Sequence, residues 1–95
     1  MKHHIIVKWN EQVQDKKAIL PEIDALFQNT TSIEGIRKVE LISNIINRPN
    51  RYDLMIVIFM DEAALPVYDE CIWHKQWKEE YGKYIASKAI FDSEE

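Results

Sequence analysis

The sequence predicts an α+β domain in which a four-stranded antiparallel sheet carries helices on one face. Three observations predict this class: segments with the two-residue alternation of strands, segments with the 3.6-residue period of helices, and their order along the chain, which is β, α, β, β, α, α, β. One helix after the first strand and helical residues before the last strand define the ferredoxin-like βαββαβ arrangement. No internal repeat or domain boundary interrupts the pattern, so residues 1–95 are predicted to form a single domain.

The first half of the chain predicts a strand, a helix and a second strand. Residues 3–9 are rich in β-branched and aromatic side chains, with the odd positions on one face and the even positions on the other. Apolar residues then recur at helical spacing between positions 19 and 27, where Pro21 either kinks the helix or starts its second half. Residues 36–46 form the second extended segment, and the turn-rich loop 47–51 follows it.

The second half predicts a strand, two helices and a last strand. Residues 54–59 are apolar without alternation, which is typical of a central strand covered on both faces. Asp61 is suited to cap a short helix that reaches Glu70, and a second helix with an aromatic stripe is predicted over residues 73–84. Residues 87–92 are predicted to form the last strand.

The predicted sheet has an open face that requires a cover. Helices protect one face only, yet residues 54–59 present apolar side chains to both faces. A second subunit that places its own sheet face to face would bury the open face in an isologous two-fold dimer. Each subunit would keep a pocket between its own sheet and helices. We therefore predict a homodimer.

The composition excludes several function classes. Hydrophobic residues at 46% and charged residues at 29% are ordinary values for a globular protein. A net charge of -4 argues against a nucleic-acid partner, because phosphate contacts require a basic face. The apolar run at residues 5–7 is too short for a membrane span or a signal peptide, and a single cysteine cannot form an internal disulfide. The chain is therefore predicted to be cytoplasmic, without a membrane partner.

The segment from Tyr68 to Trp77 concentrates the rarer residues of the chain. It contains one of the three histidines, two of the three tryptophans and the only cysteine. Because each helical residue advances the direction by about 100°, Tyr68 and His74 would point about 120° apart on one continuous helix. The two side chains can therefore meet only if the chain bends between them.

Tyr68 and His74 are the candidate catalytic residues. An imidazole accepts a proton at cellular pH, and a phenol hydroxyl donates a hydrogen bond to a carbonyl or a developing enolate. With His74 as base and Tyr68 as donor, the pair would suffice to remove a proton next to a carbonyl. The simpler alternative is that His74 begins a helix and Tyr68 anchors that helix to the core. The residue types leave both interpretations open.

Further candidate residues surround the predicted pocket. His3 shares a strand face with Ile5 and Val7, Asp53 lies where the third strand begins, and two tryptophans belong to the aromatic stripe. The candidate ligand-binding residues are His3, Ile5, Val7, Asp53, Trp73 and Trp77. The alternative for the stripe is a purely structural role in the core. No residues have the spacing of a metal site, and we predict neither a metal nor a cofactor.

Five short segments match the order and spacing of a known family over nearly the whole chain. They are His3 with Ile5-Ile6-Val7-Lys8-Trp9, Gly35-Ile36, Tyr52-Asp53-Leu54, Tyr68 six positions before His74, and Phe91-Asp92. With these segments the chain resembles the stress-responsive dimeric α/β-barrel family. The resemblance implies a homodimer whose two four-stranded sheets close into a barrel, with an internal cavity in each subunit.

The same resemblance bears on activity. Most members are stress-associated or uncharacterised small proteins, while a plant member is a polyketide cyclase that performs an aldol-type ring closure without a cofactor. Tyr68 and His74 match a working tyrosine and histidine of that cyclase. Where the cyclase has a second histidine at the start of the third strand, this chain has Asp53. Where the family often has a His-Pro pair, this chain has Cys71-Ile72.

The sequence therefore predicts a small homodimeric α/β barrel that binds a small, partly apolar molecule in an internal cavity, with its activity unassigned. One alternative is a cofactor-independent acid/base enzyme that resembles the polyketide cyclase and uses His74 and Tyr68. Another alternative is a relative of the dimeric-barrel monooxygenases that act on quinol-like aromatics. The sequence leaves open whether the protein is an enzyme.

Overall fold

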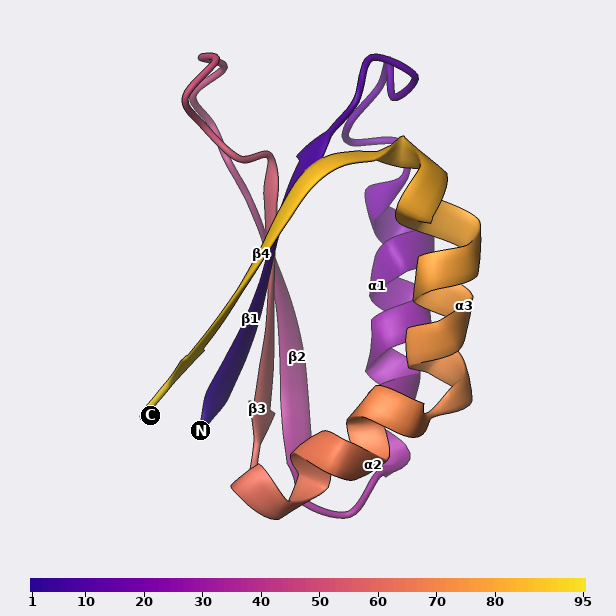
Figure 1. Ribbon diagram of the computed structural model, residues 1–95, viewed down its shortest axis with the longest axis vertical. Coiled ribbons are helices and arrows are strands. Elements are labelled where there is room, and N and C mark those ends of the chain that lie inside the picture. Colours follow the sequence, from indigo (N-terminus) through magenta and orange to yellow (C-terminus); the bar gives the residue numbers. More distant parts are fainter.

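Four antiparallel strands and three α-helices form two layers in the computed structural model, which describes residues 1–95 (Figure 1). The strands are β1 (Lys2–Trp9), β2 (Ile36–Ser43), β3 (Leu54–Met60) and β4 (Ile85–Ser93). The helices are α1 (Leu20–Gln28), α2 (Leu65–Glu70) and α3 (Ile72–Tyr81), with short 3-10 turns at Asn29–Ser32, Glu62–Ala64 and Gly82–Tyr84. The sheet order is β2-β3-β1-β4. The predicted ferredoxin-like α+β fold is confirmed.

The two central strands of the sheet are β1 and β3. Each is paired in antiparallel fashion on both of its sides. Along β1 the odd positions from His3 to Trp9 are buried against the helices, whereas the even positions are only half-buried. Along β3, five of seven residues are buried. The continuous apolar run of residues 54–59 is therefore a central strand, as predicted.

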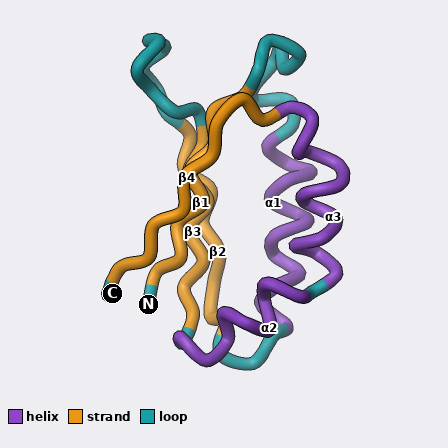
Figure 2. The backbone as a smooth tube through the Cα atoms, viewed as in Figure 1, coloured by secondary structure: helices purple, strands orange, loops and turns teal.

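The helices cover one face of the sheet only. Figure 2 shows the helical layer on one side and the bare sheet on the other. The loops of residues 10–19 and 44–53 lie at one end of the molecule, whereas α2 lies at the opposite end (Figure 2). None of the helices has the length and apolar character needed to cross a membrane.

Two predicted boundaries differ from the structure. Pro21 neither kinks α1 nor divides it, because it stands in the first turn, where a missing amide hydrogen leaves no hydrogen bond unmade. The second strand ends at Ser43 rather than at residue 46, because the last pair of its ladder joins Ser43 to Leu54. The apolar residues that follow Ser43 therefore belong to the loop.

Asp61 stands at the N-cap position directly before the helical residues, as predicted, but its side chain does not cap them. Its side chain makes no capping hydrogen bond; the carboxylate accepts one from Nη1 of Arg37 at 2.8 Å instead. A 3-10 turn follows Asp61, and α2 starts only where Pro66 can occupy the first turn. The next helix, α3, ends at Tyr81 rather than at residue 84, and Gly82–Tyr84 form a 3-10 turn after it.

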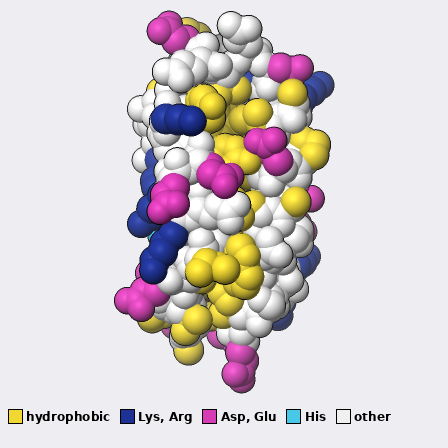
Figure 3. Space-filling view, turned by 90° about the vertical axis from the view of Figure 1, so that its right-hand side faces the viewer, with side chains coloured by type: hydrophobic (Ala, Val, Ile, Leu, Met, Phe, Trp, Pro, Cys, Tyr) yellow, Lys and Arg dark blue, Asp and Glu magenta, His cyan; other side chains and the backbone are white.

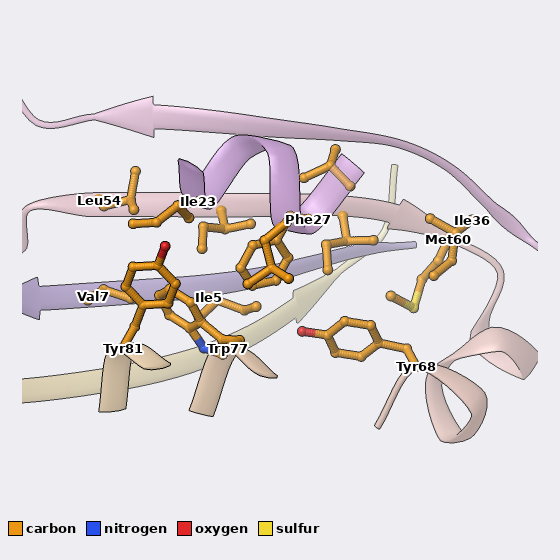
Figure 4. Close-up of a cluster of buried hydrophobic side chains, with 14 of the residues drawn as sticks. Ile5, Val7, Ile23, Phe27, Ile36, Leu54, Met60, Tyr68, Trp77 and Tyr81 are labelled. Carbon is orange, nitrogen blue, oxygen red and sulfur yellow. The ribbon is translucent and has the colours of Figure 1, made fainter. Parts of the chain in front are cut away.

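The core lies between the two layers and is centred on Trp77 (Figure 4). The indole of Trp77 is only 1% exposed. Its ring centroid lies 5.1 Å from that of Phe27, 5.3 Å from that of Tyr81 and 6.3 Å from that of Trp9. Aromatic pairs at such distances stabilise a core beyond their buried area. Trp77 thereby joins α3 to α1 and to β1.

The sheet face that the helices leave bare carries apolar side chains. Ile42 and Phe91 are 50% and 62% exposed there, in register with the even positions of β1. On the same face, the ammonium groups of Lys2 and Lys38 lie 5.4 Å and 4.3 Å from the ring centroid of Phe59. We call this side of the sheet the open face.

The turn before β2 depends on Gly35, which has a φ of +93°. A Cβ atom at this position would lie 3.2 Å from the Cβ atom of Ala64. Because this backbone conformation disfavours side chains, Gly35→Ala should lower the free energy of unfolding by about 1–2 kcal/mol. Urea denaturation monitored by circular dichroism measures the change.

Gly82→Ala is the matched control for Gly35→Ala. Gly82 has a φ of -54°, and a Cβ atom there would meet nothing within 4 Å. The control should leave the free energy of unfolding unchanged or raise it slightly, since alanine restricts the unfolded chain. Equal losses in the two variants would contradict a special backbone requirement at Gly35.

Candidate functional site

The chain bends between α2 and α3 at Cys71. The backbone of Cys71 is extended, with φ -71° and ψ 159°, and its thiol sulfur accepts a weak hydrogen bond from the His74 amide at 3.4 Å. The bend brings Tyr68 and His74 together, with their ring centroids 4.8 Å apart. The structure therefore meets the geometric condition that one continuous helix would violate.

The hydrogen bonding of His74 defines its neutral tautomer. Its Nδ1 atom lies 2.8 Å from the carbonyl oxygen of Asp69. Since a carbonyl only accepts hydrogen bonds, Nδ1 carries the hydrogen and donates it. The lone pair of the neutral ring is then on Nε2. This nitrogen is the atom of His74 that can accept a proton.

Tyr68 places an unpartnered hydroxyl in the protein interior. The residue is 1% exposed, and its hydroxyl oxygen has no hydrogen-bond partner. Figure 4 shows the hydroxyl directed away from α2, into the region of Ile5, Phe27 and Trp77. A buried polar group without a partner costs about 1–3 kcal/mol. Such a group is a natural place for a ligand to form a hydrogen bond.

Burial raises the pKa of Tyr68, and the nearby Cys71 and Asp69 raise it further. The phenol is therefore neutral throughout the physiological pH range. It can donate a hydrogen bond there, which is what the stabilisation of a carbonyl oxygen or an enolate requires.

His3 completes an aromatic row with Tyr68 and His74. It is 6% exposed, and its ring centroid lies 5.5 Å from that of Tyr68 in an edge-to-face arrangement. Nδ1 of His3 lies 2.6 Å from Oδ1 of Asp92, its direct partner across the β1–β4 ladder. The carboxylate of Asp92 orients the imidazole of His3, so that the second ring nitrogen, Nε2, points away from Asp92.

Asp92 is the residue of this site that the sequence did not assign to it. It occurs in one of the segments that carry the family resemblance, but nothing in its surroundings there indicates a role. The available signal was the predicted order of strands. In a ferredoxin-like sheet the first and last strands are neighbours, so a histidine near the start of one and a carboxylate near the end of the other face each other.

Ile5, Val7 and Trp77 are fully buried core residues. Ile5 and Val7 share the helix-facing side of β1 with His3, and Trp77 packs across from them. Figure 4 shows the Tyr68 hydroxyl directed toward Ile5 and Trp77, whereas Val7 lies farther along β1, beside Tyr81. Trp73, by contrast, is half-buried beside a shallow groove between α1 and α3. Figure 3 shows this helical side of the molecule, where apolar side chains lie among acidic ones.

Asp53 lies apart from the aromatic row. In the β1–β3 ladder, Val7 faces Leu54 and His3 faces Ile58. Asp53 directly precedes Leu54, so it lies at least four residues along the sheet from the level of His3, or about 13 Å. The carboxylate of Asp53 accepts a hydrogen bond from the Trp9 amide at 2.8 Å and pairs with Lys16. The structure therefore does not bring Asp53 together with Tyr68 and His74.

The raised pKa of Tyr68 predicts a specific loss of stability at alkaline pH. Below about pH 10 both folded and unfolded states carry a neutral phenol. Above that pH the unfolded phenol loses its proton and the folded one keeps it, so the free energy of unfolding falls by about 1.4 kcal/mol per pH unit. Tyr68→Phe should remove this contribution, as urea denaturation at several pH values between 8 and 12 would show.

At pH 7 the Tyr68→Phe variant should be more stable than the parent by about 1 kcal/mol, because the variant has no buried hydroxyl to leave unpaired. A less stable variant at pH 7 would mean that the hydroxyl has a partner in solution. Parallel stability curves above pH 10 would contradict the raised pKa.

Comparison with known proteins gives matches at the level of structure. No family model and no curated protein sequence matches the chain. A dimeric protein of unknown function with a ferredoxin-like fold from Bacteroides fragilis is 20% identical, with a TM-score of 0.69 over 99% of this chain and 94% of that chain. A DABB family protein with a ferredoxin-like fold from Mesorhizobium loti is 15% identical, with a TM-score of 0.74 over 99% and 94%.

A hydroxynitrile lyase from Passiflora edulis also matches, at 11% identity and a TM-score of 0.70 over 95% of this chain and 87% of that chain. Likeness at these identities concerns the fold. The chain has the ferredoxin-like α+β fold that these dimeric and DABB family proteins share.

Proposed function

We propose that the protein is a homodimer in which each subunit binds a small, partly apolar molecule between its sheet and its helices, at Tyr68. The observation that carries this proposal is the buried hydroxyl of Tyr68, which has no partner and belongs to a ring that packs against the rings of His3 and His74. A ligand with a carbonyl or hydroxyl group would supply the missing hydrogen bond. The apolar side chains around it are closely packed, and they would have to move apart to admit the rest of the molecule.

The open face supports the proposed homodimer. Its exposed Ile42 and Phe91 would be buried by a second copy that packs face to face, and a two-fold axis through this face would satisfy both subunits alike. The Bacteroides fragilis protein with the same fold is dimeric, which supports this arrangement.

Acid/base catalysis at the same site is a second candidate function. The tautomer of His74 favours this function. Its Nδ1 donates a hydrogen bond to a backbone carbonyl, so the lone pair on Nε2 is free to accept a proton. In this proposal Nε2 removes a proton next to the carbonyl of the ligand, and the Tyr68 hydroxyl donates to the enolate oxygen that forms. A hydroxynitrile lyase has this fold, so the fold is compatible with catalysis.

A ketone panel separates binding from catalysis. Aromatic methyl ketones are screened against the parent by thermal shift, and each ligand found is incubated with the protein in D2O to follow exchange of its α-hydrogens by NMR. If the second candidate is correct, His74→Ala should slow exchange by about 10²–10⁴-fold while leaving the thermal shift in place. Binding without exchange supports the ligand-binding function alone.

Tyr68→Phe tests the proposed contact itself. It should abolish or strongly reduce the thermal shift given by the ketones, because the hydrogen bond that orients them is lost. Tyr52→Phe is the matched control, since Tyr52 is exposed on the opposite side of the sheet. A ligand whose thermal shift is unchanged by Tyr68→Phe binds elsewhere and would contradict the proposed site.

A further inference from the structure

The end of the molecule far from Tyr68 contains an open cleft between two loops. It has a volume of about 560 Å³ and lies between the loop of residues 10–19 and the loop of residues 44–53. Both loops project from the same end of the sheet in Figure 1. A volume between about 300 and 1,000 Å³ is typical of small-molecule sites. The cleft is therefore large enough for a ligand of its own.

The floor of the cleft and part of its wall are apolar. Trp9 and Leu54, at 5% and 2% exposure, form the floor together with the half-buried Leu20. On the wall, Ile45 is 92% exposed and Ile46 is 44% exposed. Two neighbouring isoleucines in contact with water would gain stabilisation from any apolar group that covers them. The cleft thus favours a ligand with an apolar body.

The charged groups of the cleft are unequally neutralised. Asp53 pairs with Lys16 and accepts the Trp9 amide, both at 2.8 Å. Asp15 accepts two backbone amides of its own loop, at 3.1 Å and 3.2 Å. Lys17 is exposed and makes no ion pair. Asp15 thus has hydrogen-bond partners for its carboxylate, whereas the Lys17 ammonium group has neither an ion pair nor a side-chain hydrogen bond and is the charged group of the cleft left free for a ligand.

The two loops are also more basic than the rest of the chain. They contain four cationic side chains against three acidic ones, whereas the whole chain has a net charge of -4. The excess of negative charge consequently lies outside the loops. An anion approaching an otherwise acidic protein is attracted to this end of it.

We propose that the cleft binds a small organic carboxylate with an apolar body, with its anionic group at Lys17 and its apolar part over Ile45, Ile46 and the floor. A single unpaired ammonium group matches one carboxylate charge, whereas a phosphate dianion would require more cationic partners. This site is separate from the proposed site at Tyr68, which lies at the opposite end of the sheet, and either site can be present without the other.

Octanoate and its neutral analogue octanamide test the charged contact by isothermal titration calorimetry on the whole chain at low salt. Octanoate should bind more tightly than octanamide. Lys17→Gln should weaken octanoate roughly two- to fivefold and leave octanamide unchanged, which is the size expected of an exposed ion pair. Lys75→Gln, which removes an exposed lysine from α3, is the matched control and should alter neither ligand.

Backbone amide NMR locates the bound ligand. Octanoate should shift the resonances of residues 14–17 and 44–47, and these shifts should persist in His74→Ala. Ile45→Ser, a change at an exposed position that should not affect folding, should weaken both ligands alike by roughly three- to tenfold. The proposal is overturned if octanoate does not bind, if Lys17→Gln leaves its affinity unchanged, or if the shifts cluster around Tyr68 and His74.

Discussion

Trp77→Ala should lower the free energy of unfolding by about 3–5 kcal/mol, the largest loss we expect from a single truncation in this chain. The indole is 1% exposed and contacts aromatic rings from α1, β1 and its own helix. Its removal would leave a cavity in the aromatic cluster through which α1, α3 and β1 pack together. Because small domains have total stabilities of about 5–15 kcal/mol, the variant would be close to unfolded at 37 °C. Urea denaturation at 10 °C measures the loss while the variant is still folded.

Trp73→Ala is the matched control, since it removes the same side chain one turn earlier in α3. Trp73 is half-buried beside a groove rather than enclosed in the core. Its truncation should cost about 1 kcal/mol, because most of the lost contact area can be replaced by water. Similar losses in the two variants would show that Trp77 is not the centre of the core.

Phe91→Asp should dissociate the proposed homodimer. Phe91 is 62% exposed on the open face, and face-to-face packing would bury it in the interface. A carboxylate there would be desolvated without a partner in the dimer, so the dissociation constant should rise by about 30-fold or more. Sedimentation velocity over a range of protein concentrations measures this constant.

Ile90→Asp provides the control, on the same strand and on the opposite face. Ile90 is 49% exposed, but it lies in register with Ile5, on the side of the sheet that faces the helices. The control should remain as dimeric as the parent. If both variants dissociate equally, the interface includes the edge of β4 rather than the open face. The proposed dimer would be contradicted if the parent protein sedimented as a monomer at all concentrations.

The elements of the fold were predictable because sheet burial acts on every second residue. The alternation in residues 3–9 and its absence in residues 54–59 correspond directly to one strand with a half-covered face and one strand that is buried along most of its length. The boundaries were less predictable. Pro21 is compatible with a kink or with a first turn, and it stands in a first turn because the residues before Leu20 form turns rather than a helix.

The candidate site was predictable in part. Tyr68 and His74 were identified together with the condition that the chain must bend, but no proline or glycine marks the bend. Cys71 produces it through an extended backbone and a thiol acceptor, neither of which has a distinctive sequence pattern. Asp53 was associated with the site by its place in the chain. The strand register, which sequence spacing does not reveal, puts it at the other end of the sheet.

The pairing of β1 with β4 has a consequence for how the protein folds. The two strands come from opposite ends of the chain, and the bond between His3 and Asp92 closes a loop of 89 positions. Closing so long a loop costs more chain entropy than forming a local hairpin, so contacts of this kind slow folding. The β2–β3 hairpin can form from neighbouring residues, whereas His3 gains its carboxylate partner Asp92 only when both ends of the chain have met. The orientation of the His3 ring beside Tyr68 is therefore completed only when β4 docks against β1.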